Sequence, residues 1–383
     1  MSEISRVIYN IERKVLFDMK EIFYYFLKIG LIGFGGPMAH IAMMDSDLVD
    51  KRKWSTKDEF LDGLAVCNIL PGPASTQLGI YMGFLRGGIL GGTLAGIAFI
   101  LPAFIIITIL SYIYFKFGEI PSITGILYGI NAVVIALISS SLLNMYKKTV
   151  INKPQFIIFL ITTIAITLFK VNMIVAMLFA GFAGVFIYSN PTKNKNHKKL
   201  LSIALPLAYA PLLSKLFIFF LKVGSFIYGG GLVIIPFIEN EVVNKLGWLT
   251  QTEFLAGIAL GQLTPGPVVI TAAFIGYKVF GFIGALLSTV SIFIPSFIFI
   301  LVAAPYLKKI KNVLWVKAAL KGVNAAVIGS ILSSIISLVP AAIIDIPTFI
   351  IAIVGFISIV KFKVNVFWCV GISGVLGSVL TLI

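Results

Sequence analysis

Hydroxyl and amide side chains follow a Pro-Gly-Pro motif inside an apolar segment, and this arrangement suits the binding of an anion. Pro71-Gly72-Pro73 cannot lie within a continuous helix, because Pro lacks an N–H and Gly tolerates backbone angles that other residues avoid. A helix that begins after Pro73 presents free N–H groups and a positive dipole end. Ser75, Thr76 and Gln77 add side-chain donors in its first turn, so the motif predicts an oxyanion site.

The motif recurs almost two hundred residues later as Pro265-Gly266-Pro267. The matching turn there offers Val269, Ile270 and Thr271, so we expect the two breaks to differ in polarity. Asn68 and Gln262 precede the breaks and are candidate amide donors. The alternative is that each Pro-Gly-Pro only shapes a packed hairpin.

Composition makes the chain a polytopic all-α membrane protein. Of 383 residues, 59% are hydrophobic and 12% are charged, and the mean hydropathy is +1.06, which is far from the balance of soluble domains. Lipid cannot satisfy the backbone groups that a broken helix frees. Each helix is therefore expected to be broken or re-entrant there, with the irregular backbone either buried in protein or lining a polar cavity, which makes each break a candidate site.

Several other classes of function are disfavoured by composition. Two isolated cysteines and two histidines do not form a metal or thiol-redox motif, so no metal and no cofactor are expected. The net charge of +15 falls mostly in short loops, where the orientation of a membrane protein explains it better than nucleic-acid binding does. No hydrolase or zinc-protease motif is present, so the chain is not expected to be an enzyme.

Four segments are expected along the chain. They are an amphipathic surface helix over residues 1–20, a first membrane repeat over 21–188, a basic linker over 189–199, and a second membrane repeat over 200–383. The first span, 22–44, should break at its glycines. The spans at 154–169 and 171–188 are short for full crossings and are expected to be tilted or partial.

The two membrane segments are an internal duplication. A shift of 194 positions places Lys28 on Lys222, Trp54 on Trp248 and the first Pro-Gly-Pro on the second, and a shift of 193 places Asn131 on Asn324. Such a register of glycines, a lysine, a tryptophan and a proline motif is not expected from apolar composition alone.

Basic residues predict that the repeats are inverted. Residues 45–59 hold four Lys/Arg against one in 239–253; residues 114–128 hold one against five in 307–321; and residues 144–153 hold three against none in 337–346. Because cytoplasmic loops are the basic ones, equivalent loops should lie on opposite faces. About five crossings in each half satisfy this, and the alternative is one further crossing at 200–215.

These motifs together resemble the chromate ion transporter family in its two-repeat form. The resemblance is carried by Phe34-Gly35-Gly36-Pro37 with His40 behind it, by both Pro-Gly-Pro breaks, and by Tyr228-Gly229-Gly230-Gly231. It implies a secondary transporter that exports the chromate dianion from a bacterial cytoplasm and confers resistance. The second repeat departs from the first where Pro37 becomes Gly231 and His40 becomes Ile234, which confines any role of those positions to one half.

Other repeated polar residues are candidates for the pathway. The substrate candidates are Lys28 and Lys222, which attract the dianion or merely snorkel; Asn131 and Asn324, which line the path or bond to a neighbouring backbone; and Gly35, Gly36, Gly229 and Gly230, which allow close backbone approach. Candidates for proton coupling are His40, Asp45 and Glu239, with packing of the histidine and solvation of the acids as alternatives.

The sequence thus favours a multi-pass carrier of a tetrahedral oxyanion in the inner membrane, in contact with lipid, with a homodimer as a candidate assembly. Inverted repeats with broken helices are typical of alternating access. A sulfate-type carrier and an anion channel remain alternatives, and a membrane-embedded enzyme is a more distant one.

Overall fold

The structure, a computed structural model, describes residues 3–34, 36–118, 120–188, 212–227, 231, 234–303 and 314–382. Every regular element in these ranges is helical. Four of the described helices are long and apolar enough to cross a membrane, namely Ala74–Phe117, Ile123–Thr149, Val268–Val302 and Trp315–Ala342. The prediction of an all-α polytopic protein is confirmed.

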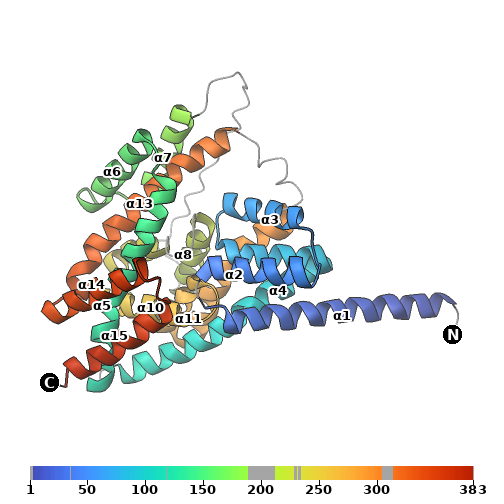
Figure 1. The fold of residues 1–383 in the computed structure, drawn as a ribbon, viewed down its shortest axis with the longest axis horizontal. Coiled ribbons are helices and arrows are strands. Elements are labelled where there is room, and N and C mark those ends of the chain that lie inside the picture. The colour runs from blue at the N-terminus through green and yellow to red at the C-terminus, as the bar shows by residue number, and fades with distance from the viewer. Residues whose placement is uncertain are drawn as a thin grey trace.

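The first repeat runs from α1 to α7. Its elements are α1 (Glu3–Ile32), α2 (Gly36–Met44), a π-helix (Asp45–Lys51), α3 (Lys57–Ile69), α4 (Ala74–Phe117), α5 (Pro121–Thr149), α6 (Lys153–Thr167) and α7 (Met173–Tyr188). Helix α1 extends far from the other helices toward the N-terminus (Figure 1). The helix expected for residues 1–20 is continuous with the segment that follows it, and the first apolar span does break at its glycines.

The second repeat has its helices in the same order and adds a 3-10 turn and a second π-helix. Its elements are α8 (Leu212–Phe226), α9 (Ile234–Ile238), a π-helix (Glu239–Lys245), α10 (Gln251–Leu263), a 3-10 turn (Val268–Ile270), α11 (Thr271–Ile298), a π-helix (Phe299–Ala303), α13 (Leu314–Ala342), α14 (Ile346–Val360) and α15 (Val366–Leu380). The sequences 189–211, which include the expected linker, lie outside the described residues.

Local backbone geometry repeats with the sequence. Helix α5 begins at Pro121 and α13 at Leu314, which is 193 positions later, and their last residues are separated by the same interval. Thr56 and Thr250 both form capping boxes at the starts of α3 and α10. Left-handed residues also occur in matched pairs, among them Gly72 with Gly266, Gly88 with Gly281, and Lys170 with Lys363. The duplication predicted from the sequence is therefore a duplication of the fold.

Two re-entrant hairpins open the first repeat. Arg52 pairs with Glu21 at 2.7 Å and Trp54 lies 5.5 Å from the Tyr25 ring, so the chain that leaves α2 returns beside α1. Helix α4 reverses at Gly87 and Gly88, whose backbone angles are not helical. Its first arm, which pairs with α3, ends at Arg86, and Arg86 binds Asp18 at 2.7 Å. Both hairpins thus start and finish at one end of the molecule, which we call the Trp54 end.

The hairpins of the second repeat start and finish at an equivalent end of the molecule, which we call the Trp248 end. Trp248 lies 6.0 Å from Phe219 of α8, and Lys278, at the end of the first arm of α11, pairs with Glu253 at 2.7 Å. Lys278 also lies 5.0 Å from the ring of Phe115, near the C-terminus of α4. The second arm of α4 starts at the Trp54 end and spans about 43 Å at 1.5 Å per residue. The two ends are therefore on opposite sides, and the repeats are inverted.

The path of the chain in the first repeat does not agree with the prediction of about five membrane crossings in each half. Helix α5 returns the chain to the Trp54 end, and the Tyr188 hydroxyl donates to Asn152 at 2.7 Å, so α6 and α7 also leave and return there. Helix α8, in contrast, starts toward the Trp248 end. The described helices of the first repeat give no net crossing, so five crossings per half is wrong. The alternative, a further crossing at 200–215, falls mostly on residues 200–211, which lie outside the described residues.

The repeats are interlocked rather than side by side. Helices α6 and α7 pack on α13 of the second repeat, and α14 and α15 pack on α5 of the first. In Figure 1, α6 and α7 lie beside α13, on the side away from the protruding part of α1. Small residues permit the close approach, since Gly129 faces the Ser373 carbonyl and Gly322 the Ala180 carbonyl. At the centre α4 packs on α11, which brings the two Pro-Gly-Pro breaks into one region.

Candidate functional site

The tips of the re-entrant hairpins meet and exchange backbone hydrogen bonds. The Gly72 N–H donates to the Ile227 carbonyl at 2.7 Å, and the Gly266 N–H donates to the Gly33 carbonyl at 3.2 Å. Ile227 and Gly33 are themselves equivalent positions, directly after α8 and α1. Glycine is required at both tips because φ is +132° at Gly72 and +96° at Gly266. Hairpins that enter from opposite ends thus meet in the interior, where each break touches the other repeat.

The first break places unpartnered polar groups at a helix start. Helix α4 begins at Ala74, as predicted, and its N-cap Pro73 has no capping side chain, so it does not satisfy the first-turn N–H groups. Ser75, Thr76 and Gln77 are fully buried. The Gln77 amide donates to the Pro71 carbonyl at 2.6 Å, whereas Ser75 Oγ and Thr76 Oγ1 have no hydrogen-bond partner among the described residues.

Two such hydroxyls are unusual, because buried polar groups in native proteins are normally bonded and an unbonded one costs about 1–3 kcal/mol. Hydroxyl donors, free N–H groups and a positive dipole end all favour a negatively charged acceptor. The first break therefore has the chemistry of an anion site.

The second break is apolar at the matching positions. Val269 and Ile270 are buried there, and the Thr271 hydroxyl donates to the Val268 carbonyl at 3.0 Å. Pro265 and Pro267 flank the tip and are buried as well. The asymmetry expected from the sequence is present in the geometry.

A histidine from the first repeat stands beside the second break. His40 is fully buried in α2, its Nε2 lies 2.7 Å from the Gly33 carbonyl, and its ring meets Phe99 edge-on at 5.0 Å. The same carbonyl accepts the Gly266 N–H, so Nε2 carries the proton in this contact. His40 Nδ1 has no partner among the described residues. His40 is thus both a packing residue and a titratable group next to a hairpin tip.

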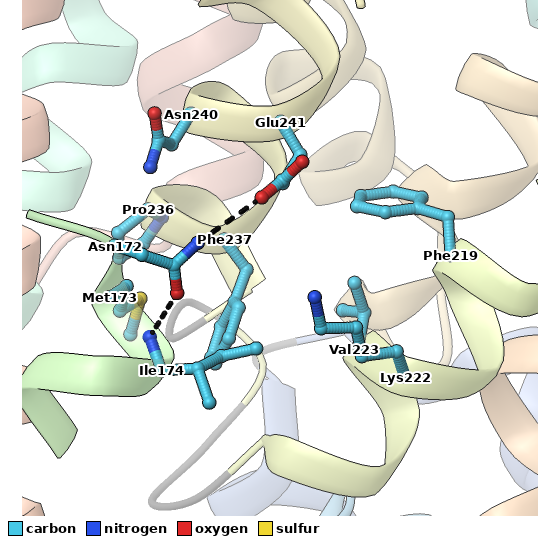
Figure 2. Close-up of a pocket in the computed structure, with 10 residues that line it drawn as sticks. All are labelled: Asn172, Met173, Ile174, Phe219, Lys222, Val223, Pro236, Phe237, Asn240 and Glu241. Carbon is cyan, nitrogen blue, oxygen red and sulfur yellow. Dashed lines mark hydrogen bonds between the residues drawn. The ribbon is translucent and has the colours of Figure 1, made fainter. Parts of the chain in front are cut away.

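The two lysines lie outside the buried breaks. Lys28 and Lys222 are both exposed. Lys222 points from α8 into a pocket that is also lined by Asn172, Asn240 and Glu241 (Figure 2). The Asn172 amide donates to Glu241 at 3.3 Å, and Glu241 pairs with Lys245 at 2.8 Å. This pocket lies on the Trp248 side of the tips, so Lys222 does not lie at either break.

The other predicted residues are dispersed. Asn68 is exposed, Gln262 and Asn324 are half-buried, and Asn131 is buried with an unpartnered Oδ1. Gly36 has a left-handed φ of +74°, whereas Gly35, Gly229 and Gly230 lie outside the described residues. Of these, only Asn131 shares the buried, unpartnered character of the first break.

The two acids proposed for proton coupling have different environments. Asp45 pairs with Lys57 at 2.5 Å, which places it among the ion pairs of the Trp54 end and away from the tips. Its equivalent Glu239 is buried, lies near Ser334 and Ser337 of α13, and keeps one oxygen without a partner in the described part of the chain. Burial of a carboxylate at such a site is costly and is typical of functional positions.

The family profile described as chromate transporter matches residues 20–185 and 214–378. The chain belongs to the chromate transporter family. A chromate transport protein of Cupriavidus metallidurans is 36% identical over 91% of this chain and 89% of its own length. A probable chromate transport protein of Synechococcus elongatus is 35% identical over 89% and 90%, and a chromate transport protein of Pseudomonas aeruginosa is 32% identical over 83% and 80%. No solved structure matches.

The two segments that match the chromate transporter family coincide with the two helical repeats described above. The family is one of transporters, and its membership agrees with a multi-pass membrane protein. Sequence reasoning missed two features of this family member. One is the contact between Asn172 and Glu241. The sequence signals it, because Asn172 recurs as Asn365 and Glu241 corresponds to Asp47 in the other repeat. The other is Ser296, which lies against Gly72 of the first break. Its sequence signal is only a hydroxyl directly after the Pro inside an apolar helix.

Proposed function

We propose that this protein is a secondary transporter of chromate or of another tetrahedral oxyanion. The observation that carries the proposal is the pair of buried, unpartnered hydroxyls, Ser75 and Thr76, at the uncapped start of α4. The relatives named as chromate transport proteins support chromate as the substrate. Sulfate has the same shape and charge, so it is the competitor against which chromate has to be tested.

The direction of transport is proposed from the basic end of the molecule. Described Lys and Arg residues of the three basic loops lie at the Trp54 end, namely Lys51, Arg52, Lys53, Lys57, Lys147, Lys148, Lys153, Lys317 and Lys321. The positive-inside rule makes this end cytoplasmic in an inner membrane. A dianion that leaves an inside-negative cell gains about 4.6 kcal/mol per 100 mV, so export and chromate resistance need no other driving force.

The mechanism follows from the meeting of the tips. The anion binds at the first break, and the site opens alternately to one end of the molecule and to the other as the hairpins of the two repeats separate and come together again. The hydrogen bonds from Gly72 and Gly266 are the contacts that break and re-form. Lys222, and Lys28 at the equivalent position of the other repeat, attract the anion toward the tips. His40 and Glu239 are the groups placed to carry a proton if transport is coupled to one. Lipid surrounds the exposed apolar helices, and a homodimer is the candidate assembly.

Flux through the purified protein in proteoliposomes tests the proposal. We expect saturable chromate flux, stimulated by chromate on the opposite side and inhibited by sulfate or molybdate more than by phosphate. Stronger transport of sulfate than of chromate would make this a sulfate-type carrier. Fast, non-saturating flux without stimulation from the opposite side would make it a channel, and the absence of flux of any of these anions would refute oxyanion transport.

A further inference from the structure

A hydroxyl of the second repeat lies against the tip of the first break. Ser296 is in α11, directly after Pro295, and is fully buried. A Cβ atom placed on Gly72 would lie 2.6 Å from Ser296 Oγ and 3.0 Å from Cδ of Gln77. The hydroxyl and the Gln77 amide therefore converge on the Gly72 backbone from opposite repeats.

Ser296 does not make the hydrogen bond that helical hydroxyls usually make. In the same helix the Thr289 hydroxyl donates to the Ala285 carbonyl at 2.8 Å, and the Ser291 hydroxyl donates to the Leu287 carbonyl at 2.5 Å, each four residues back. Ser296 Oγ has no partner among the described residues. Ser288 Oγ of the same helix is also buried and unbonded, but it lies against Gly276. A buried, unbonded donor destabilises the protein on its own, and Ser296 lies against the tip of the first break, so a ligand there explains it better than packing does.

The second break supplies an internal comparison. Pro102 of α4 matches Pro295 at a shift of 193, so Ala103 occupies the position of Ser296. A Cβ atom on Gly266 would lie 3.1 Å from the Ala103 methyl. The same point of the fold thus carries a hydroxyl at the break that has Ser75 and Thr76, and a methyl at the break that lacks them. Among the described residues at the two breaks, the unpartnered hydroxyls, Ser75, Thr76 and Ser296, are all at the first break, whereas the Thr264 and Thr271 hydroxyls at the second are bonded.

We propose that Ser296 donates a hydrogen bond to the oxyanion at the first break, so that one tetrahedral dianion is held by both repeats. This inference rests on the proposed function. The start of α4, with Ser75 and Thr76, holds the anion from the first repeat, and Ser296 holds another of its oxygens from the second. The bound substrate then links α4 to α11 across the interface at which the repeats move.

The test compares Ser296→Ala with two matched controls in the full-length purified protein. We expect Ser296→Ala to weaken chromate binding about tenfold, which is the effect of losing one hydrogen bond to a charged group. Binding is read from chromate-dependent thermal stabilisation and from half-saturation of flux in proteoliposomes. Ser291→Ala removes a bonded hydroxyl of the same helix, and Ala103→Ser adds a hydroxyl at the second break; both should leave chromate affinity unchanged.

A second readout separates a ligand from a structural role. Removing an unbonded hydroxyl should leave the melting temperature of anion-free protein unchanged or higher, whereas removing a structural one should lower it. Unchanged chromate affinity in Ser296→Ala, with affinity lost in a Ser75→Ala/Thr76→Val variant, would overturn the shared site and leave the proposed function standing. Absence of chromate, sulfate and molybdate binding by the unmodified protein would overturn both.

Discussion

Replacing both hydroxyls of the first break, Ser75→Ala with Thr76→Val, should weaken oxyanion binding without damaging the fold. Both side chains are fully buried and neither hydroxyl has a partner among the described residues. Hydrogen bonds to a charged group contribute about 1.5–3 kcal/mol each. Because both would act on one ligand, their effects are not additive, and we expect a combined loss of about 2–4 kcal/mol, or about 30- to 700-fold in affinity.

The assay is chromate flux in proteoliposomes, with half-saturation and maximal rate measured separately, together with thermal stabilisation by chromate. Some binding should survive because the backbone N–H groups of α4 remain. Ile270→Val is the matched control, since Ile270 occupies the position of Thr76 in the second repeat and its change should be silent. A double variant that transports chromate with unchanged half-saturation and rate would refute the first break as the anion site and direct attention to Lys28 and Lys222.

Three further results are expected. Single cysteines at Val150 and Ile343, in a background without the native cysteines, should react with an impermeant thiol reagent from opposite sides; labelling from one side only would contradict the inversion. An inside-negative potential should speed outward chromate flux from vesicles of known orientation, and slower flux would exclude simple electrogenic export. The Tyr128 hydroxyl, donating at 2.6 Å, and then the Thr348 N–H hold the pKa of Asp345 below its ordinary value of 3.8. Tyr128→Phe should therefore lower thermal stability above about pH 4, and the deficit should vanish as pH falls through the pKa of Asp345 in the folded protein; a deficit that persists below that pKa would contradict this linkage.

The repeat and its breaks could be predicted from the sequence because they depend on local chemistry. Pro-Gly-Pro ends a helix wherever it occurs, and Thr56 with Glu59, like Thr250 with Glu253, forms a capping box within four residues. Charge in the loops was enough to predict inversion. The crossing count was not predictable, since the boundary at Arg86, Gly87 and Gly88 does not show whether the chain before it crosses the membrane or, as in the structure, turns back as a hairpin.

The membership of the site was less predictable because it depends on tertiary contacts. Lys28 and Lys222 have the same repeat signal as the glycines, yet both are exposed, whereas Ser296 has no repeat signal and lies at the tip of the first break. The exchange of bonds from Gly72 to Ile227 and from Gly266 to Gly33 joins residues more than 150 positions apart. Spacing along the chain carries no information on contacts of that kind.

The contrast between the two breaks has a physical reason in the charge of the proposed substrate. The tips touch, so two equivalent anion sites would lie close together. Two dianions at an assumed separation of about 10–15 Å repel by about 4–7 kcal/mol at an effective dielectric constant of about 20. That repulsion would cancel most of the binding free energy of a second anion at micromolar affinity, which is about 8 kcal/mol. Hydroxyls at both breaks would therefore add little to the binding of a second anion. Val269 and Ile270 of the second repeat and Ala103 of the first make the second break apolar, and His40 of the first repeat lies beside it, which agrees with a single anion site at the first break.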